Sequence, residues 1–220
     1  MRKTAAVAKH SYLKVPTPIA LIETAERLFA EQGIEGVSLR QIRIEAKVGN
    51  DAAIRYHFGD RAQLIAAIWE YRLPVLDRAR AALLHRAEAA GLTRDPRTVF
   101  DVLTRPGYDL VDEQGRHRYL AFLANAMRWR EGGAIRERHM GLSPASIAAK
   151  DLLRDIAPQV PADLLRRRLR FATQAFFEAV IERDRALEDG LPAEPEQAFL
   201  AEQYDMMAAV CLMPVGPAPA

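Results

Sequence analysis

The sequence predicts an all-α protein. Between clusters of Pro and Gly, the apolar residues recur at steps of three and four, which is the period of an α-helix. No segment of useful length alternates apolar and polar residues as a strand would. The predicted helices are short up to about residue 60 and longer beyond it. We therefore expect an arm at 1–17, a small helical domain at 18–60, a larger one at 61–213 and a tail at 214–220.

Composition narrows the class of protein. The chain has 220 residues, half of them apolar, so it can bury a core without disulfides or metals. Its one cysteine, Cys211, excludes an intrachain disulfide and fits a reducing compartment. The five histidines lack the paired spacing of a zinc site, so we expect no metal and no cofactor. With no signal peptide and no membrane-spanning stretch in the sequence, we expect a cytoplasmic protein associated with the nucleoid.

Positive charge is concentrated at the start of the chain. Residues 1–60 hold nine Lys and Arg against seven Asp and Glu, whereas the remaining 160 residues hold 22 of each. The first acidic residue is Glu23, and the basic residues before it are Arg2, Lys3, Lys9 and Lys14. Such an arm can lie along phosphates. It can equally be a disordered, solubilising tail, and the charges alone leave both readings open.

Three short helices are expected in the N-terminal domain. The first runs from about Pro18 to Gln32 and is stopped by Gly33. The second begins at Ser38, and Gln41 three residues later predicts a capping box. The third runs from Asn50 or Asp51 to His57, and Asp60 is expected to cap the next helix.

Longer helices are expected after Arg61. The first should run to Leu73, where Pro74 is expected to break or kink it, and the period resumes up to Ala90. Further helices are predicted at 95–104, 116–131, 144–156, 161–188 and 195–212. Proline in the first helical turn suits the starts of the last two.

The second and third helices, joined by a tight turn, predict a helix-turn-helix. In this unit the N-terminal side chains of the second helix of the pair meet base edges in the major groove. Its partner crosses the DNA backbone and directs its N-terminus at a phosphate. Helical triples of this size also occur in proteins that never bind DNA, so the spacing alone does not decide between the two.

Three segments in this region resemble a known family. They are AERLFAEQG at 25–33, VSLRQI at 37–42 and YHFGDRAQL at 56–64. In this order and near this spacing they resemble the DNA-binding signature of the tetracycline-repressor (TetR) family, over about residues 18–66. The resemblance implies a small DNA-binding domain followed by a larger helical domain that binds a small molecule and forms a homodimer.

The sequence departs from the common family pattern at the turn. The stretch from Ala46 to Phe58 is one residue longer, and Lys47 stands where the family usually has a turn glycine. The Gly49-Asn-Asp segment resembles a subgroup with an Asn-containing turn before Tyr-His-Phe. Arg61 stands where the family usually has lysine and keeps the positive charge.

Eight residues are candidates for contact with double-stranded DNA. Asn can read adenine, Asp can accept from cytosine and Arg can take a guanine edge or a phosphate, while hydroxyl and ring groups suit phosphates. The candidates are Ser38, Arg40, Asn50, Asp51, Arg55, Tyr56, His57 and Arg61.

Each candidate has a plainer interpretation. Ser38 and Asp51 can serve as helix caps. His57 can pack beneath the fourth helix instead of facing DNA. Arg40 and Arg55 can simply be solvated.

Large soft side chains in the second half of the sequence are candidates for an effector pocket. We single out Tyr119, Phe122, Trp129 and Phe176. Tyr119 and Trp129 are preferred because each needs a polar partner when buried. The alternative for every one of them is a place in an ordinary hydrophobic core.

Two apolar stripes predict a homodimer through 161–188 and 195–213. The first is Leu165, Leu169, Ala172, Phe176, Ala179 or Val180, Arg183 and Leu187, and the second is Phe199, Gln203, Met206, Val210 and Met213. Two such helices from each subunit can form a four-helix bundle. The alternative is that one chain buries both stripes itself.

The sequence thus predicts a ligand-responsive repressor that binds a palindromic operator as a dimer. An enzyme is not expected, because the sequence has no glycine-rich phosphate loop, metal-ligand spacing or nucleophile elbow. The remaining alternative is a helical protein-binding scaffold with no role on DNA, which the salt dependence of DNA binding would distinguish.

Overall fold

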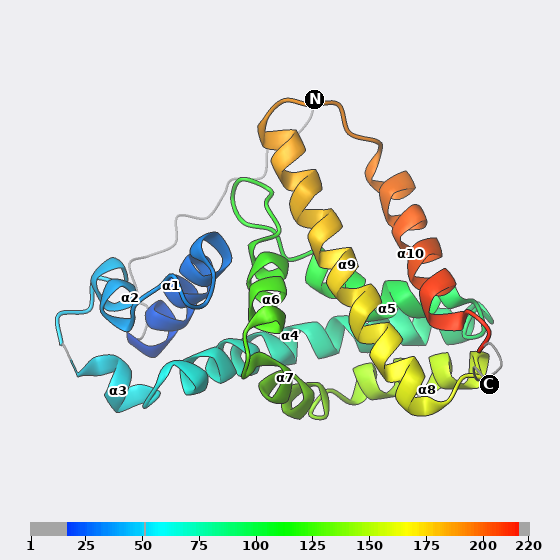
Figure 1. The fold of residues 1–220 in the computed structure, drawn as a ribbon, viewed down its shortest axis with the longest axis horizontal. Coiled ribbons are helices and arrows are strands. Elements are labelled where there is room, and N and C mark those ends of the chain that lie inside the picture. Colours follow the sequence, from blue (N-terminus) through cyan, green and yellow to red (C-terminus); the bar gives the residue numbers. More distant parts are fainter. Residues whose placement is uncertain (1–16, 51, 216–220) are drawn as a thin grey trace, which may run out of the picture.

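The computed structural model describes residues 17–50 and 52–215, and over these residues the regular secondary structure is all α-helix (Figure 1). The prediction of an all-α protein is therefore confirmed. The helices are α1 (Thr17–Gln32), α2 (Leu39–Glu45), α3 (Ala53–His57), α4 (Arg61–Ala89), α5 (Pro96–Tyr108), α6 (Arg118–Arg128), α7 (Gly132–Met140), α8 (Pro144–Ile156), α9 (Ala162–Glu188) and α10 (Glu196–Leu212).

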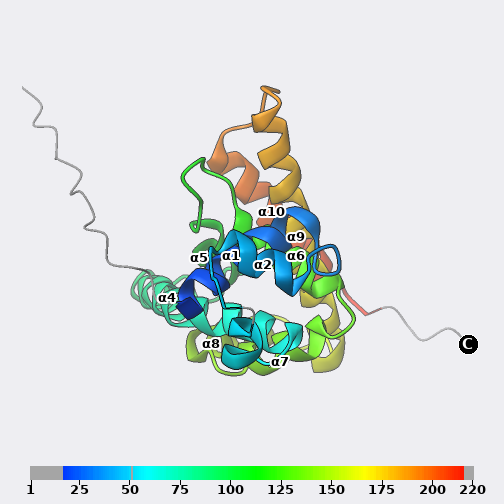
Figure 2. The ribbon, with the colours of Figure 1, turned by 90° about the vertical axis from the view of Figure 1, so that its left-hand side faces the viewer.

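The three short helices gather at one end of the molecule, and α4 runs from them along its length (Figure 1). At the other end, α9 and α10 pack against each other. Figure 2 looks onto the end formed by α1, α2 and α3. Among the described residues, no helix has the combination of length and hydrophobicity that crossing a bilayer needs.

Polar caps define the starts of the short helices. Ser38 caps α2 as predicted, since its Oγ accepts from the Gln41 amide at 3.1 Å. The second half of the predicted capping box is wrong, because the Gln41 side chain donates to Gln32 and Glu45 instead, both at 3.2 Å. Asp60 caps α4 as predicted, with its Oδ1 2.8 Å from the Gln63 amide.

The predicted break of α4 at Pro74 is wrong, since α4 continues from Arg61 to Ala89 as one helix, while a kink there stays a prediction. Proline removes one helical hydrogen bond, the one that would reach the carbonyl of Glu70. Both Pro74 and Glu70 are exposed, so the unpartnered carbonyl lies on the solvent side of the helix. Water can satisfy it there, and the helix survives.

Two helices after α4 also differ from the predicted ranges. Pro106 and Gly107 fall in the last turn of α5, which extends to Tyr108. Gly132 begins α7, a helix that the sequence did not predict. A Cβ on Gly132 would lie 1.7 Å from the carbonyl oxygen of Ala126, so only glycine fits this turn between α6 and α7.

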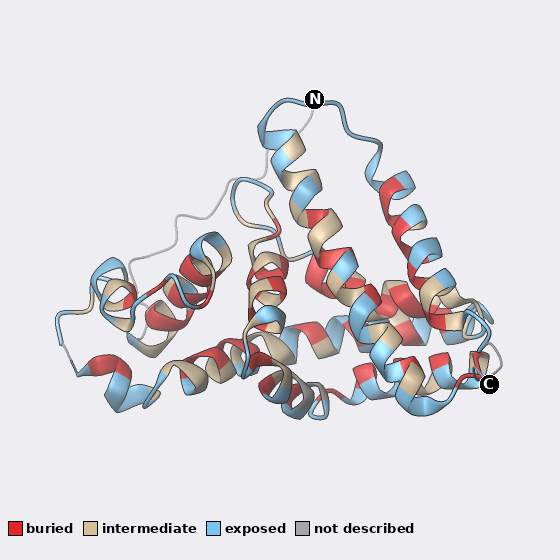
Figure 3. Cartoon of the chain, in the orientation of Figure 1, coloured by how far each residue is buried: buried red, intermediate tan, exposed pale blue. Residues whose placement is uncertain are grey.

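One continuous hydrophobic core joins the short helices to the rest of the chain (Figure 3). The Phe29 ring of α1 stacks on Phe122 of α6 with centroids 6.4 Å apart. Trp69 of α4 lies 6.0 Å from the same Phe122 ring. Phe122 of α6 thus contacts aromatic rings of both α1 and α4.

The chain itself buries much of the two predicted apolar stripes. Leu165, Ala172, Phe176 and Val180 of α9 are buried in the core, as are Phe199 and Gln203 of α10. These residues are therefore buried within one chain, which was the alternative to burial between two subunits. Other apolar side chains on the same two helices remain exposed, namely Phe171, Leu187 and Met206, as does Met213 directly after α10.

Candidate nucleic-acid interface

The turn between α2 and α3 contains a residue in the left-handed region. Lys47 adopts φ of 55°, at the position where the family resemblance expects glycine. Glycine favours that conformation because it carries no Cβ, but a lysine side chain can be accommodated there at some steric cost. The turn therefore keeps the backbone geometry of a glycine turn and adds an exposed positive charge.

The start of α3 is organised by Asn50. Its Oδ1 accepts from the Ala52 amide at 2.9 Å, and its carbonyl accepts from the Ala53 amide at 3.1 Å. The helix begins at Ala53, later than the sequence predicts. The candidate Asp51 lies outside the described residues. Asn50 thus already has a structural role, and reading of adenine by its amide stays a prediction.

The side chains that follow on α3 project into solvent. Arg55, Tyr56 and His57 are all exposed, and Tyr56 exposes 82% of its surface. The Tyr56 and His57 rings meet edge to face with centroids 5.0 Å apart. The exposure of His57 contradicts the alternative that it packs beneath α4. Ala53 and Ile54 anchor the opposite side of this short helix in the core.

Arg40 on α2 is also exposed, whereas Arg61 makes a hydrogen bond within the protein. The Arg61 Nη2 donates to the carbonyl of Val37 at 2.9 Å and so ties the start of α4 to the residue before the α2 cap. The half-buried Arg61 side chain thereby holds the start of α4 against the segment before α2. Contact of Arg61 with phosphate remains a prediction. Within the described residues neither Arg40 nor Arg55 makes an ion pair, which leaves both guanidinium groups available to a ligand.

Polar contacts hold α1 to α4 and α6. Arg72 of α4 makes two hydrogen bonds to the carboxylate of Glu26, at 2.7 and 2.8 Å. Asn125 of α6 donates from Nδ2 to the carbonyls of Phe29 and Ala30, at 2.8 and 3.1 Å. A shift of α4 or α6 along its axis would therefore be transmitted to α1.

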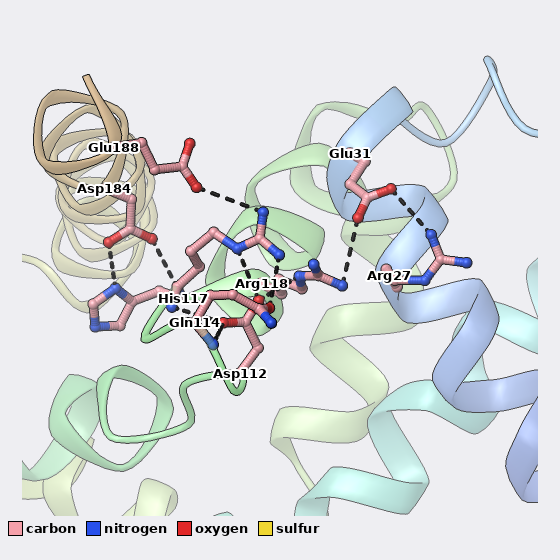
Figure 4. A network of polar contacts seen from close by, with 9 residues as sticks. Arg27, Glu31, Asp112, Gln114, His117, Arg118, Asp184 and Glu188 are labelled. Atoms are coloured by element: carbon pink, nitrogen blue, oxygen red, sulfur yellow. Dashed lines mark hydrogen bonds and ion pairs between the residues drawn. The ribbon is translucent and has the colours of Figure 1, made fainter.

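A longer polar network continues from α1 to α9 (Figure 4). Glu31 of α1 lies 3.5 Å from Arg118, which pairs with Asp112 at 2.5 Å. Asp112 also accepts from Arg116, which reaches Glu188 at 3.5 Å. Burial acts to raise the pKa of Asp112, but the amides of Arg116 and Gln114 and the Arg116 side chain outweigh it, so the pKa is lowered.

His117, the residue after Arg116, adds hydrogen bonds to α9. Its amide and its Nδ1 both lie 2.7 Å from the carboxylate of Asp184. The segment 112–118 thus links the short N-terminal helices to the long helix α9 through charged groups.

A separate cavity of about 90 Å³ lies among α4, α5, α6, α7, α8 and α9. Of the four predicted pocket residues, Tyr119 lines it. Phe122 and Phe176 are buried in the core, and Trp129 is half-buried at the end of α6; none of the three lines this cavity.

Sequence reasoning did not single out Arg80 and Lys150, which also line this cavity. A signal for Arg80 exists, because it interrupts an otherwise apolar stripe of α4 formed with Leu76, Leu84 and Ala87. Lys150 stands out only once α8 is packed beside α4.

Two solved structures are similar to this chain to different extents. A tetR family transcription regulator from Shewanella sp. PV-4 superposes with a TM-score of 0.60 at 18% identity, over 88% of this chain and 96% of that chain. The TetR family regulator PfmR from Thermus thermophilus gives 0.48 at 18% identity, over 90% and 96%. The first of these likenesses shows that the fold is shared.

Comparisons of sequence bear on the family. Residues 21–68 match the family model described as bacterial regulatory proteins, tetR family. The HTH-type transcriptional regulator AcrR of Shigella flexneri is 26% identical over 167 residues, which cover 74% of this chain and 75% of that protein. These matches are to transcription regulators and not to enzymes. Taken with the capped three-helix unit, they support a transcriptional regulator with a tetR-family DNA-binding region at residues 21–68.

Proposed function

We propose that the protein is a homodimeric repressor that binds a palindromic operator and is released from it by a small molecule. The observation that carries the proposal is the exposure of Arg40, Arg55 and Tyr56 on two adjacent short helices whose other faces are buried. In this proposal residues 18–60 contact DNA, and residues 61–213 bind the effector and the second subunit.

On DNA, α3 enters the major groove and α2 crosses the backbone. Arg55 reads a guanine edge or binds a phosphate, while Tyr56 and His57 contact phosphates beside it. Arg40 and Lys47, exposed on α2 and the following turn, add positive charge along the backbone.

The exposed apolar side chains of α9 and α10 support a dimer. Phe171 exposes 67% of its surface, Met206 47% and Met213 56%. Arg168 donates to the carbonyls of Cys211 and Met213, so the segment around Phe171 lies beside the end of α10. Exposed apolar side chains gathered on one surface mark an association site. A two-fold dimer through this surface presents two α3 helices to two half-sites.

The cavity supports control by a small molecule. Its walls include Trp69 and Leu73 of α4 and Leu123 and Met127 of α6. These are the helices that hold α1 through Arg72 and Asn125. A ligand that separates α4 from α6 therefore changes the position of α1 and of the helices that reach DNA.

The test is selection of DNA bound by the purified protein from a random pool, followed by measurement of its mass on the selected site. We expect an inverted repeat whose half-sites are about one helical turn apart, bound by twice the single-chain mass of 24.6 kDa. Recovery of no enriched sequence, with no binding to DNA from its own promoter region, would contradict the proposal and favour a scaffold.

A further inference from the structure

Arg80 is an unusual residue in the centre of α4. Its side chain is buried, with 7% of the residue's surface exposed, and it lines the cavity described above. Among the described residues, its buried Nε and Nη1 atoms have no hydrogen-bond partner. A buried guanidinium that is left unpaired carries a large desolvation penalty, which an anionic partner would remove.

A second cation faces the same cavity. Lys150 of α8 lines it, and burial first, then Arg136 and Arg80, lower the pKa of this ammonium to about 8. Arg136 of α7 lines the cavity as well. Three cationic side chains from three helices thus converge on one enclosed space.

Three acidic side chains nearby that the structure describes are already engaged. Asp77, one turn before Arg80, accepts from the hydroxyl of Ser143 and, at 3.1 Å, from the amide of Ala145. Asp151 pairs with Arg154 at 2.9 Å. On the far side, Glu70 lies 3.2 Å from Nε2 of His139 and is largely exposed. None of these carboxylates bonds to the Nε or Nη1 of Arg80.

The rest of the cavity wall is apolar. Leu76, Leu103, Leu120, Leu169 and Phe177 surround the cationic groups. The enclosed volume of about 90 Å³ is below the roughly 150 Å³ of a cavity that admits benzene. A groove of about 650 Å³ between α8 and α9 shares Arg136, Lys150 and Leu169 with the cavity. A ligand body therefore has room to extend outward past Lys150.

We propose that this cavity binds an organic carboxylate, with its charged group on Arg80 and Lys150 and a short apolar body against the leucines. That this molecule is the effector rests on the function proposed above, whereas binding itself does not. The guanidinium of Arg80 supplies two donors to one carboxylate, and Lys150 supplies the countercharge at the groove side. Cationic and neutral molecules of the same shape are disfavoured, because they bring no negative charge to Arg80 and Lys150.

The direct experiment is calorimetric titration of the full chain, without DNA, with hexanoate and benzoate. The matched neutral probes are hexanamide and benzamide, and hexylamine is the cationic probe. We expect each carboxylate to bind about tenfold or more tightly than its amide, as a charged hydrogen bond to a buried partner provides. Equal affinity for carboxylate and amide, or no binding of either carboxylate at millimolar concentration, would overturn the proposal.

Variants separate a binding role of Arg80 from a structural one. Arg80→Met should abolish the preference for carboxylate and raise the Tm of the ligand-free protein by about 2–4 °C, because an unpaired buried charge is removed. The matched control is Arg78→Met, an exposed arginine two residues earlier on the same helix, which should change neither quantity. A lowered Tm with unchanged carboxylate binding would assign Arg80 to the fold alone. Lys150→Met, at a half-buried site, should also weaken carboxylate binding about tenfold.

The two proposals fail in different ways. Binding of benzoate by a protein that binds no DNA would leave the carboxylate site intact and remove the repressor function. If the protein binds its operator but does not bind benzoate, and no carboxylate weakens operator binding, the proposed repressor function stands. The carboxylate site is then overturned.

Discussion

The surface residues of α3 and the residues that shape its ends have different roles. Asn50 is bonded to the backbone of the turn and Arg61 to the carbonyl of Val37, so both stabilise the unit. Among the described residues neither Arg55 nor Tyr56 makes such a bond, and both are exposed. Specific reading of DNA is therefore expected to depend most on Arg55.

Arg55→Ala should weaken operator binding by about 1–3 kcal/mol, the range for an arginine bonded to a guanine edge. Folding and dimer mass should be unchanged, because the side chain is exposed. Fluorescence anisotropy with the selected operator measures the affinity, and Arg78→Ala serves as a control of equal charge change. An unaltered affinity of the Arg55 variant would place the recognition surface elsewhere.

Ser38→Ala tests the cap of α2. Loss of the hydroxyl that accepts from the Gln41 amide should lower the free energy of unfolding by about 1 kcal/mol. Urea denaturation measures it as a lower midpoint at unchanged slope. Ser38→Asp keeps an acceptor at the cap and should retain most of the stability, and equal midpoints for Ala and wild type would refute the role of the cap.

The affinity for carboxylate should depend on pH through Lys150. Its pKa of about 8 lies below the ordinary lysine value, so the ammonium is mostly charged at pH 7 and loses its proton as the pH rises through 8. Arg80, Arg136 and His139 line the same cavity, and Asp151 adjoins Lys150 on α8. The arginines stay charged over this range.

Calorimetry from pH 7 to pH 9 should therefore show benzoate binding weaken above about pH 8. In Lys150→Met the affinity should be lower throughout and nearly independent of pH over the same range. A wild-type affinity that does not change over this range would exclude Lys150 from the binding site.

At the scale of elements, the proposed dimer places its interface on α9 and α10. Phe171→Glu and Met206→Glu each place a charge on an apolar, exposed position of these helices. Either substitution should shift the mass measured by light scattering from a dimer towards the single-chain value of 24.6 kDa.

The control for these variants is Val75→Glu, since Val75 is exposed to a similar extent, 54%, on α4. It should remain dimeric. A full dimer mass for both the Phe171 and the Met206 variants would exclude this surface as the interface.

Local sequence signals predicted the elements that depend on local chemistry. The bounds of α8, the Ser38 cap and the Asp60 cap were predictable because a cap and a period of apolar residues determine them. The break at Pro74 was wrongly predicted because its outcome depends on which side of α4 faces solvent. The start of α7 at Gly132 depends on a close approach to Ala126, which the sequence does not encode locally.

The same limit applies to the sites. A period of three and four residues marks the buried side of α9, but it cannot tell whether this chain or a second one covers it. The exposure of Arg40 and Arg55 could be predicted from the spacing of the short helices. Arg80 and Lys150 line the same cavity because α4 and α8 meet in space, so no local pattern predicts that they do.

At the scale of the whole molecule, the DNA-facing end and the helical bundle form one mechanical unit. Phe29 and Phe122 join them through the core, Asn125 through the backbone of α1, and Arg118 through the polar network that ends at Asp184 and Glu188 of α9. The cavity lies between the helices that carry these contacts. Occupation of the cavity and the spacing of two α3 helices in a dimer are therefore expected to be coupled.

The central claim is that the exposed basic residues around α2 and α3 bind DNA. The most direct test is the affinity of the purified protein for its selected operator, measured by anisotropy across a range of salt concentrations. We expect a steep linear fall of log affinity with log salt, corresponding to the release of several counterions per dimer, and a shallower slope for Arg40→Ala. Binding that is absent, or that does not change with salt, would contradict it.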